Sequence, residues 1–324
     1  MASRIVKALV AMALLPAAPT HLGAKTTTPA ATNAEAPASF LSLDQLRTRH
    51  GVAADRYLDI GGLSIRYRDE GQGPVIVLLH GSYGALTSYD GVAEKLAGSY
   101  RIIRFDMPGM GLSSTLPRSA ETPIRFADDI LKALLDHLKV SKATIVGVSS
   151  GGSLGFYFTR AHPDMVNALI LSNAPADPVI SSQIQRSPAL AAEFREAERT
   201  GFKRREYWRI YLEWLAGDTA RMTPGIIDKY YDLNRRQPAP DARNFWRSTN
   251  DVPLTRATLA AITKPVLLVW GEKDFVLPLS SMHALESYLP SAQVSRVIMP
   301  DVGHYPPLET PERFAKIVDT YVRV

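Results

Sequence analysis

Three polar residues, Ser149, Asp274 and His304, each follow a run of apolar or β-branched residues that predicts a strand. In this chain order they can supply a nucleophile, an orienting carboxylate and a general base. A serine hydroxyl is a weak nucleophile near neutral pH, so it needs a base that accepts its proton. The base needs a carboxylate on its other nitrogen, which selects the tautomer and stabilises the imidazolium. The three residue types therefore predict acyl transfer at a serine.

Glycine stands two positions before and two positions after Ser149, as Gly147 and Gly151. This G-x-S-x-G spacing is typical of a serine on a very tight strand-to-helix turn, where side chains on either side would collide. The same turn leaves the N–H of Ser150 free at a helix N-terminus. An ordinary strand–turn–helix connection can carry the same pattern, so the assignment depends on the other motifs.

The stretch His80-Gly81-Ser82 follows a fully apolar run at residues 75–79. Acyl transfer places negative charge on the carbonyl oxygen in the transition state, and this charge needs hydrogen-bond donors. We assign the oxyanion hole to the backbone N–H groups of Ser82 and Ser150.

Short apolar runs alternate with segments of helical spacing along most of the chain. This rhythm predicts an α/β fold with a mainly parallel central sheet and helices on both faces. Functional groups in such sheets gather at the carboxyl ends of the strands, which brings the candidate residues to one edge. We expect strands at residues 57–60, 63–68, 75–79, 101–105, 144–148, 168–171, 265–270 and 293–299, and helices near 40–50, 87–96, 124–138, 150–162, 280–288 and 311–322.

The rhythm breaks after Asn173, and residues from about 175 to 253 are helical in pattern and rich in aromatic side chains. We expect this segment to be an inserted helical cap over the edge where the loops gather. Some of its aromatic side chains should line a pocket for an apolar acyl group. The candidates are Trp208, Tyr211, Trp214, Tyr230, Tyr231, Phe245 and Trp246.

The first 24 residues have a short basic start, an apolar run too short to span a bilayer, and small residues before Lys25. They predict a signal peptide at 1–24, followed by a flexible linker at 25–39 that is rich in Thr, Ala and Pro. The hydrolase-type domain would then cover 40–324. The protein is expected to be exported, to the periplasm or the medium, with no stable membrane span in the mature chain.

The composition of the 324 residues limits the chemistry. The net charge is +5, but acidic and basic residues are interleaved, so no nucleic-acid-binding surface is expected. The chain has no cysteine, which excludes disulfides, thiolate metal ligands and a cysteine nucleophile. No histidine pair or glycine-rich fingerprint supports a metal or a dinucleotide, so no cofactor is expected.

Five motifs in chain order resemble those of the α/β-hydrolase fold family. They are His80-Gly81, the run from Asp106 to Gly111, the run from Gly147 to Gly151, the run from Gly271 to Asp274, and Gly303-His304. The resemblance covers about residue 57 to the C-terminus, apart from the insertion. It implies a nucleophile at Ser149, an acid at Asp274 and a base at His304. Serine at the nucleophile position argues against the dehalogenase and epoxide hydrolase branches and favours the capped serine branch.

A second carboxylate competes for the acid role. Asp177 lies just beyond the predicted strand at 168–171, which is a position that some family members use for their acid. We favour Asp274, because it follows its strand on a glycine-bearing turn.

These features predict an exported serine hydrolase that cleaves a small or medium carboxylic ester through an acyl-enzyme. The same residues would also serve a carbon–carbon bond hydrolase, a lactonase, or an enzyme that transfers the acyl group to another alcohol. A non-catalytic receptor that keeps the triad for ligand binding is the alternative from another class. The sequence does not distinguish these substrates, because the insertion determines the pocket.

Overall fold

The computed structural model describes residues 39–116, 124–236 and 245–323, which belong to one unit of the chain, residues 38–324. The predicted signal peptide lies outside these residues, as does the predicted linker except for Ser39. Both stay predictions.

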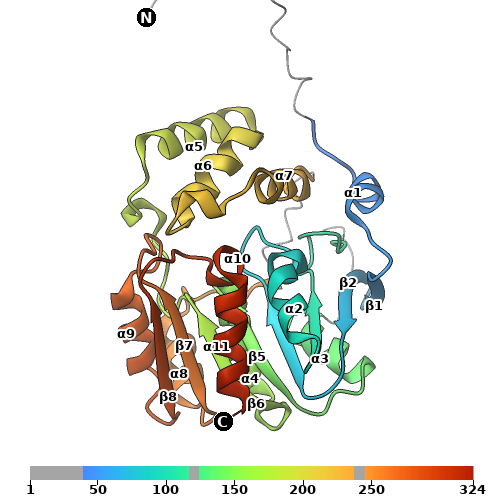
Figure 1. Cartoon of the computed structure of the whole chain (residues 1–324), viewed down its shortest axis with the longest axis vertical. Coiled ribbons are helices and arrows are strands. Elements are labelled where there is room, and N and C mark those ends of the chain that lie inside the picture. Colours follow the sequence, from blue (N-terminus) through green and yellow to red (C-terminus); the bar gives the residue numbers. More distant parts are fainter. Residues whose placement is uncertain (1–38, 117–123, 237–244, 324) are drawn as a thin grey trace, which may run out of the picture. The chain divides into compact units, whose positions relative to one another are not determined.

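The described residues form one eight-stranded sheet in the order β1-β2-β4-β3-β5-β6-β7-β8 (Figure 1). Strand β2 is antiparallel to both of its neighbours, β1 and β4. The other six strands, in the spatial order β4-β3-β5-β6-β7-β8, are parallel to one another. The predicted α/β class with a mainly parallel sheet is confirmed. The strands are β1 (Arg56–Ile60), β2 (Leu63–Glu70), β3 (Val75–Leu79), β4 (Arg101–Phe105), β5 (Ala143–Val148), β6 (Val166–Ser172), β7 (Val266–Gly271) and β8 (Val294–Met299).

The hairpin between β1 and β2 has a two-residue loop, Gly61-Gly62, flanked by the paired residues Ile60 and Leu63. Both glycines have positive φ angles, 60° and 85°. Two left-handed residues in a row give the loop twist that matches antiparallel strands, and glycine adopts them without steric cost.

Helices cover both faces of the sheet (Figure 1). Alternate residues of β3 pack against one layer or the other. Ile76 and Leu78 of β3 share a buried cluster with α2 (Asp90–Leu96) and α11 (Pro311–Arg323). Val77 and Leu79 point the opposite way, into a cluster with four other helices. Apolar side chains on both faces explain the continuous apolar runs of the parallel strands. These four helices are α3 (Ala127–His137), α4 (Ser150–Ala161), α8 (Val252–Ala260) and α9 (Leu279–Ser287).

Between β6 and α8 the chain forms a helical insertion, defined here as residues 173–236 and 245–251. Its main helices are α5 (Pro188–Thr200), α6 (Arg205–Leu215) and α7 (Pro224–Leu233), which share a small core centred on Tyr207 and Trp208. Ser187 and Thr223 cap α5 and α7, each followed by a proline in the first turn. The insertion was predicted to end near residue 253. Helix α8 was not anticipated, and it packs against α4 in the layer beside the sheet.

The remaining elements are short. Among those with bounds inside the described residues are α1 (Leu43–His50), α10 (Pro306–Glu309) and 3₁₀ turns at Leu86–Tyr89, Pro163–Met165, Ser181–Gln183 and Thr219–Arg221. Helix α10 follows the loop after β8 directly, and α11 then runs back along the sheet. The carboxyl ends of β3, β5, β6, β7 and β8 therefore carry the loops that hold the candidate residues.

Candidate active site

Ser149 sits on the turn between β5 and α4 in a strained conformation, with φ 54° and ψ −128°. A β-carbon on Gly147 would lie 2.3 Å from the carbonyl oxygen of Gly151, and one on Gly151 would lie 2.2 Å from the carbonyl oxygen of Leu79. Real β-carbons do not approach backbone oxygens so closely. The two glycines of the motif are therefore required by the turn itself, which holds Ser149 above the strand ends.

The structure brings Ser149, His304 and Asp274 together. Nε2 of His304 lies 3.1 Å from Oγ of Ser149, and Nδ1 of His304 lies 2.7 Å from Oδ2 of Asp274. His304 and Asp274 are buried, with 4% and 3% of their surface exposed, whereas Ser149 is partly exposed. The chain thus places a serine, an imidazole and a carboxylate in line across three strand ends.

Asp274 accepts hydrogen bonds on both of its carboxylate oxygens. Its Oδ2 accepts from Nδ2 of Asn173 and its Oδ1 accepts from the backbone N–H groups of Val276 and Leu277, at 2.7, 2.7 and 2.9 Å. Because these amide groups can only donate, both carboxylate oxygens act as acceptors, and Oδ2 can also accept from an N–H at Nδ1 of His304. In the neutral imidazole with its hydrogen on Nδ1, Nε2 is the nitrogen that can accept the proton of Ser149.

The loop that carries His304 is held from two sides. The backbone N–H of His304 donates to the carbonyl oxygen of Leu215 in the insertion, at 2.8 Å. The buried carboxylate of Glu309 accepts from the N–H groups of Gly303 and Gly217, at 2.9 and 2.8 Å. Burial raises the pKa of Glu309, and the hydrogen bonds from Gly217 and Gly303 oppose this rise. The insertion and the histidine loop are therefore joined by direct backbone contacts.

Ser82 and Ser150, the predicted oxyanion residues, lie side by side. Their hydroxyl oxygens are 3.0 Å apart, and within the described residues neither backbone N–H donates a hydrogen bond to another protein atom. At Gly81 a β-carbon would lie 2.9 Å from Cβ of Ser149 and 2.3 Å from Oη of Tyr305. Glycine at this position thus lets the backbone of the 80–84 loop approach the serine closely.

His80 connects this loop to the one after β4. Its Nε2 accepts from the N–H of Met107 at 3.1 Å, so the hydrogen sits on Nδ1, which donates to the carbonyl oxygen of Gly81 at 2.8 Å. Burial lowers the pKa of His80, and the nearby Asp106 carboxylate opposes this shift. Asp106 itself accepts from the N–H of Leu86 at 2.6 Å. Both side chains support the loop and do not contact Ser149 through any described hydrogen bond.

Asp177, the rival acid, does not reach His304. Its carboxylate accepts from Oη of Tyr288 at 3.0 Å and lies 3.4 Å from Nη2 of Arg256. Asp177 and Asp274 line one cavity of about 420 Å³ at the start of the insertion, yet only Asp274 faces the imidazole. Asp274 is therefore the carboxylate in contact with His304, and its role as the acid stays a prediction.

The aromatic side chains of the insertion divide into two groups. Trp208 and Tyr211 of α6 pack edge-on against Tyr83, at centroid distances of 5.5 and 6.1 Å. Tyr83 directly follows Ser82 in the chain. Phe245 and Trp246 instead join the core between the sheet and α3, α4, α8 and α9. Of these four residues, Trp208 and Tyr211 lie next to the loop of Ser82, whereas Phe245 and Trp246, which were expected to belong to the cap, lie in the main core.

Sequence reasoning missed Asn173 and the fixed contacts of Glu309. Asn173 stands where the strand rhythm breaks, but nothing in the pattern identified its amide as a partner of Asp274. Its left-handed conformation, with φ 44°, is one that asparagine tolerates better than most residues. The one sequence feature that could have indicated this contact is an asparagine close behind the predicted strand at 168–171.

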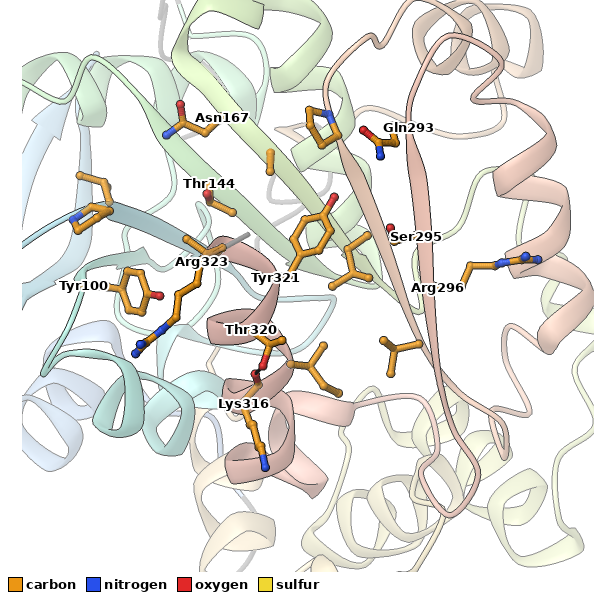
Figure 2. Close-up of a pocket in the computed structure, with 18 of the residues that line it drawn as sticks. Tyr100, Thr144, Asn167, Gln293, Ser295, Arg296, Lys316, Thr320, Tyr321 and Arg323 are labelled. Atoms are coloured by element: carbon orange, nitrogen blue, oxygen red, sulfur yellow. Dashed lines mark hydrogen bonds between the residues drawn. The ribbon is translucent and has the colours of Figure 1, made fainter.

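A groove of about 1130 Å³ lies at the other end of the sheet (Figure 2). Its walls include Thr144, Asn167 and Gln293 near the amino ends of the strands, and Tyr321 of α11. Ser149 lies at the carboxyl ends, so this groove is separate from the triad.

Among the residues that the structure describes, no cluster of three or more histidine or carboxylate side chains could hold a metal ion. Within the same residues, no helix combines the length and the apolar character needed to cross a membrane.

Comparisons with known proteins agree with this architecture. An uncharacterised protein of Mycobacterium tuberculosis is 28% identical over 283 residues, which cover 82% of this chain and 80% of that protein. A 2-hydroxy-6-oxo-6-(2'-aminophenyl)hexa-2,4-dienoic acid hydrolase of Metapseudomonas resinovorans is 27% identical over 271 residues, covering 81% and 88%. The solved structure of a thermophilic esterase from Thermogutta terrifontis is 27% identical with a TM-score of 0.64, covering 83% of this chain and 98% of that one.

The family model described as the alpha/beta hydrolase fold matches residues 74–311. This range includes the loop with Ser82, the elbow at Ser149, and the loops with Asp274 and His304. Of the two characterised proteins named above, one is a hydrolase of a dienoic acid and the other is an esterase. The chain therefore belongs to the α/β-hydrolase fold family.

Proposed function

We propose that this protein is an exported serine hydrolase that cleaves a small or medium carboxylic ester through an acyl-enzyme. One observation carries the proposal. The Oγ of Ser149 lies 3.1 Å from Nε2 of His304, whose Nδ1 lies 2.7 Å from the Asp274 carboxylate. This arrangement has the two hydrogen bonds that make a serine nucleophilic.

In the first half-reaction, Oγ of Ser149 attacks the carbonyl carbon while Nε2 of His304 takes its proton. The negative charge moves to the carbonyl oxygen, where the N–H groups of Ser82 and Ser150 would stabilise it. When the tetrahedral intermediate collapses, the imidazolium gives its proton to the departing alkoxide. The alcohol leaves and Ser149 keeps the acyl group.

In the second half-reaction, His304 removes a proton from water, whose oxygen attacks the acyl carbon. The second tetrahedral intermediate breaks the bond to Oγ of Ser149, which recovers its proton from the imidazolium. Asp274 stays ionised throughout and offsets the positive charge on the ring. The carboxylic acid is then released.

The acyl group is proposed to be apolar, since the partly exposed rings of Tyr83 and Tyr211 pack against the buried Trp208 next to Ser82. The inserted segment, which carries Trp208 and Tyr211, is proposed to act as a cap. Export is proposed from the basic start and short apolar run of residues 1–24. N-terminal sequencing of the mature protein tests export, with a start near Lys25 expected and an intact Met1 in the cytoplasm contradicting it.

Carbon–carbon bond hydrolysis is the second candidate. It is favoured by the 27% identity to a hydrolase named for a 2-hydroxy-6-oxo-hexa-2,4-dienoic acid. The same serine, histidine and aspartate can attack a ketone carbonyl, and the leaving group is then a stabilised carbanion that takes up the proton.

The first experiment uses a fluorophosphonate probe on the full chain and on Ser149→Ala. We expect labelling of the wild-type chain at Ser149 and none of the variant. A panel of 4-nitrophenyl esters from acetate to decanoate, run beside lactones and a 2-hydroxy-6-oxo-dienoic acid, then ranks the substrates by kcat/KM. Labelling that persists in Ser149→Ala contradicts the nucleophile, and tight binding without turnover of any substrate favours a receptor.

A further inference from the structure

Asn173 lies directly after β6, where the parallel strands end. Its side chain is fully buried, and its backbone has a φ angle of 44°. The backbone N–H donates to the carbonyl oxygen of Val269 at 3.2 Å, which continues the pairing of β6 with β7 by one residue. The amide group is therefore held between two strand ends at the centre of the site.

The orientation of this amide is determined by its partners. Oδ1 of Asn173 accepts from the N–H of Gly271 at 3.2 Å, and a backbone N–H can only donate. Nδ2 must then face Asp274, where it donates to Oδ2 at 2.7 Å. This is the same oxygen that accepts from Nδ1 of His304 at 2.7 Å. One carboxylate oxygen is thus shared between an amide and the imidazole.

We propose that Asn173 is a positioning residue of the triad, which orients the carboxylate of Asp274 and limits how strongly this carboxylate stabilises the imidazolium of His304. This inference rests on the proposed function, because a role in positioning the triad requires that the triad is catalytic. A donor on a carboxylate oxygen stabilises its negative charge and leaves less of it for a second partner. A carboxylate oxygen shared with Asn173 therefore stabilises the imidazolium less than an unshared one would.

The groups around His304 are few in the described part of the chain. Asp274 contacts Nδ1, the ring of Tyr305 lies edge-on with centroids 5.6 Å apart, and the Glu309 carboxylate binds the N–H of Gly303. Asn173 acts on the imidazole through Asp274, which also accepts from the backbone N–H groups of Val276 and Leu277. A change of the Asn173 side chain alters the charge sharing without touching His304 directly.

The choice of asparagine follows from the same contacts. A left-handed residue is strained for most side chains, whereas asparagine, aspartate and glycine tolerate it. An apolar side chain would leave the Gly271 N–H without its acceptor. An aspartate would keep that acceptor but put a second negative charge beside Asp274. Asparagine alone satisfies both neighbours.

The test measures the second-order rate constant for fluorophosphonate labelling of the full chain as a function of pH. This readout depends on activation of Ser149 and not on the natural substrate. We expect the acid limb of the profile to move to higher pH in Asn173→Gly, by about half a unit, because Asp274 regains charge for the imidazolium. Asn173→Asp should move it further, by about one unit or more, since a second carboxylate also stabilises the imidazolium.

Asn167→Asp is the matched control, since it adds the same charge at the exposed amino end of the same strand. It should leave the profile in place. Circular dichroism selects the variants that fold, and Asn173→Gly or Asn173→Ser serves where Asn173→Asp does not. Slower labelling with an unmoved acid limb in the folded variants would show a merely structural role and overturn this inference alone. A wild-type chain that the probe does not label would overturn the proposed function and this inference with it.

Discussion

The side-chain amide of Asn234, at the end of α7, donates to the carbonyl oxygen of Tyr83 at 3.0 Å. Tyr83 follows Ser82 directly and has a positive φ angle of 61°, which few tyrosines adopt. The same amide also donates to the carbonyl oxygen of Tyr230 at 2.9 Å. The insertion therefore restrains the loop whose backbone is proposed to stabilise the oxyanion.

Asn234→Ala tests this restraint. Without the amide, the N–H of Ser82 should lose its fixed direction, and kcat for a good ester should fall about tenfold, less than when an oxyanion donor is removed outright. Steady-state kinetics measure the change, with the exposed Asn250→Ala as the control that should keep wild-type kcat. Equal kcat in both variants would show that the loop holds its shape without Asn234.

Asp274→Asn tests the orienting carboxylate. The amide keeps the shape but removes the charge and can favour the wrong tautomer of His304. In serine proteases the same exchange costs about 10⁴-fold in kcat, and we expect a loss of similar size here. Asp177→Asn, whose carboxylate contacts Tyr288 and Arg256, should cost about tenfold or less. The reverse ranking, in variants shown to be folded, would move the acid to Asp177.

Asp301→Asn tests an ion-pair bridge between the insertion and α11. Asp301 binds Arg221 and Arg313, and these hydrogen bonds lower its pKa to about 2. A lowered pKa in the folded state stabilises the protein above the unfolded-state pKa of about 4, and this contribution is lost as the pH falls toward 2.

Because Asp301 is 44% exposed, the variant should lose less than about 1 kcal/mol at pH 7. Urea unfolding at pH 7, 5 and 3 measures the difference from the wild-type chain. It should be constant between pH 7 and 5 and smaller at pH 3. A difference that grows on acidification would contradict the assignment.

Two glycine-to-alanine exchanges should have opposite effects on stability. A β-carbon on Gly151 would lie 2.2 Å from the carbonyl oxygen of Leu79, so Gly151→Ala should disrupt the elbow and lower the melting temperature. A β-carbon on Gly225, in the first turn of α7, meets no atom within 4 Å. Gly225→Ala should stabilise the chain by about 0.5 kcal/mol and keep activity. Thermal unfolding compares the two.

The sheet was largely predictable from the sequence, since strands buried on both faces appear as unbroken apolar runs. Residues 75–79 and 101–105 form β3 and β4 with the predicted bounds. The positions of Ser149, Asp274 and His304 followed from the rule that functional loops gather at the carboxyl ends of parallel strands.

Contacts between distant segments were not predictable in the same way. The amide of Asn173 reaches Asp274 across 101 residues of sequence, and no local pattern encodes such a partner. Helix α8 was missed because its apolar spacing is weak and it follows a segment read as irregular. Phe245 and Trp246 were assigned to the insertion by their position in the chain, whereas tertiary packing places them in the main core.

Three hydrogen bonds hold the loop of His304 and the insertion together. The N–H of His304 donates to the carbonyl oxygen of Leu215, and Glu309 accepts from the N–H groups of Gly217 and Gly303. In a chimera that exchanges the insertion for that of a relative, the loop of His304 would keep these partners only where the grafted backbone follows the same path at residues 215 and 217. A graft that keeps residues 215–221 from this chain should retain the geometry of the base while Trp208 and Tyr211 are replaced. The boundary of the exchangeable module therefore falls inside the insertion, at the last residue of α6, and not at the strand ends.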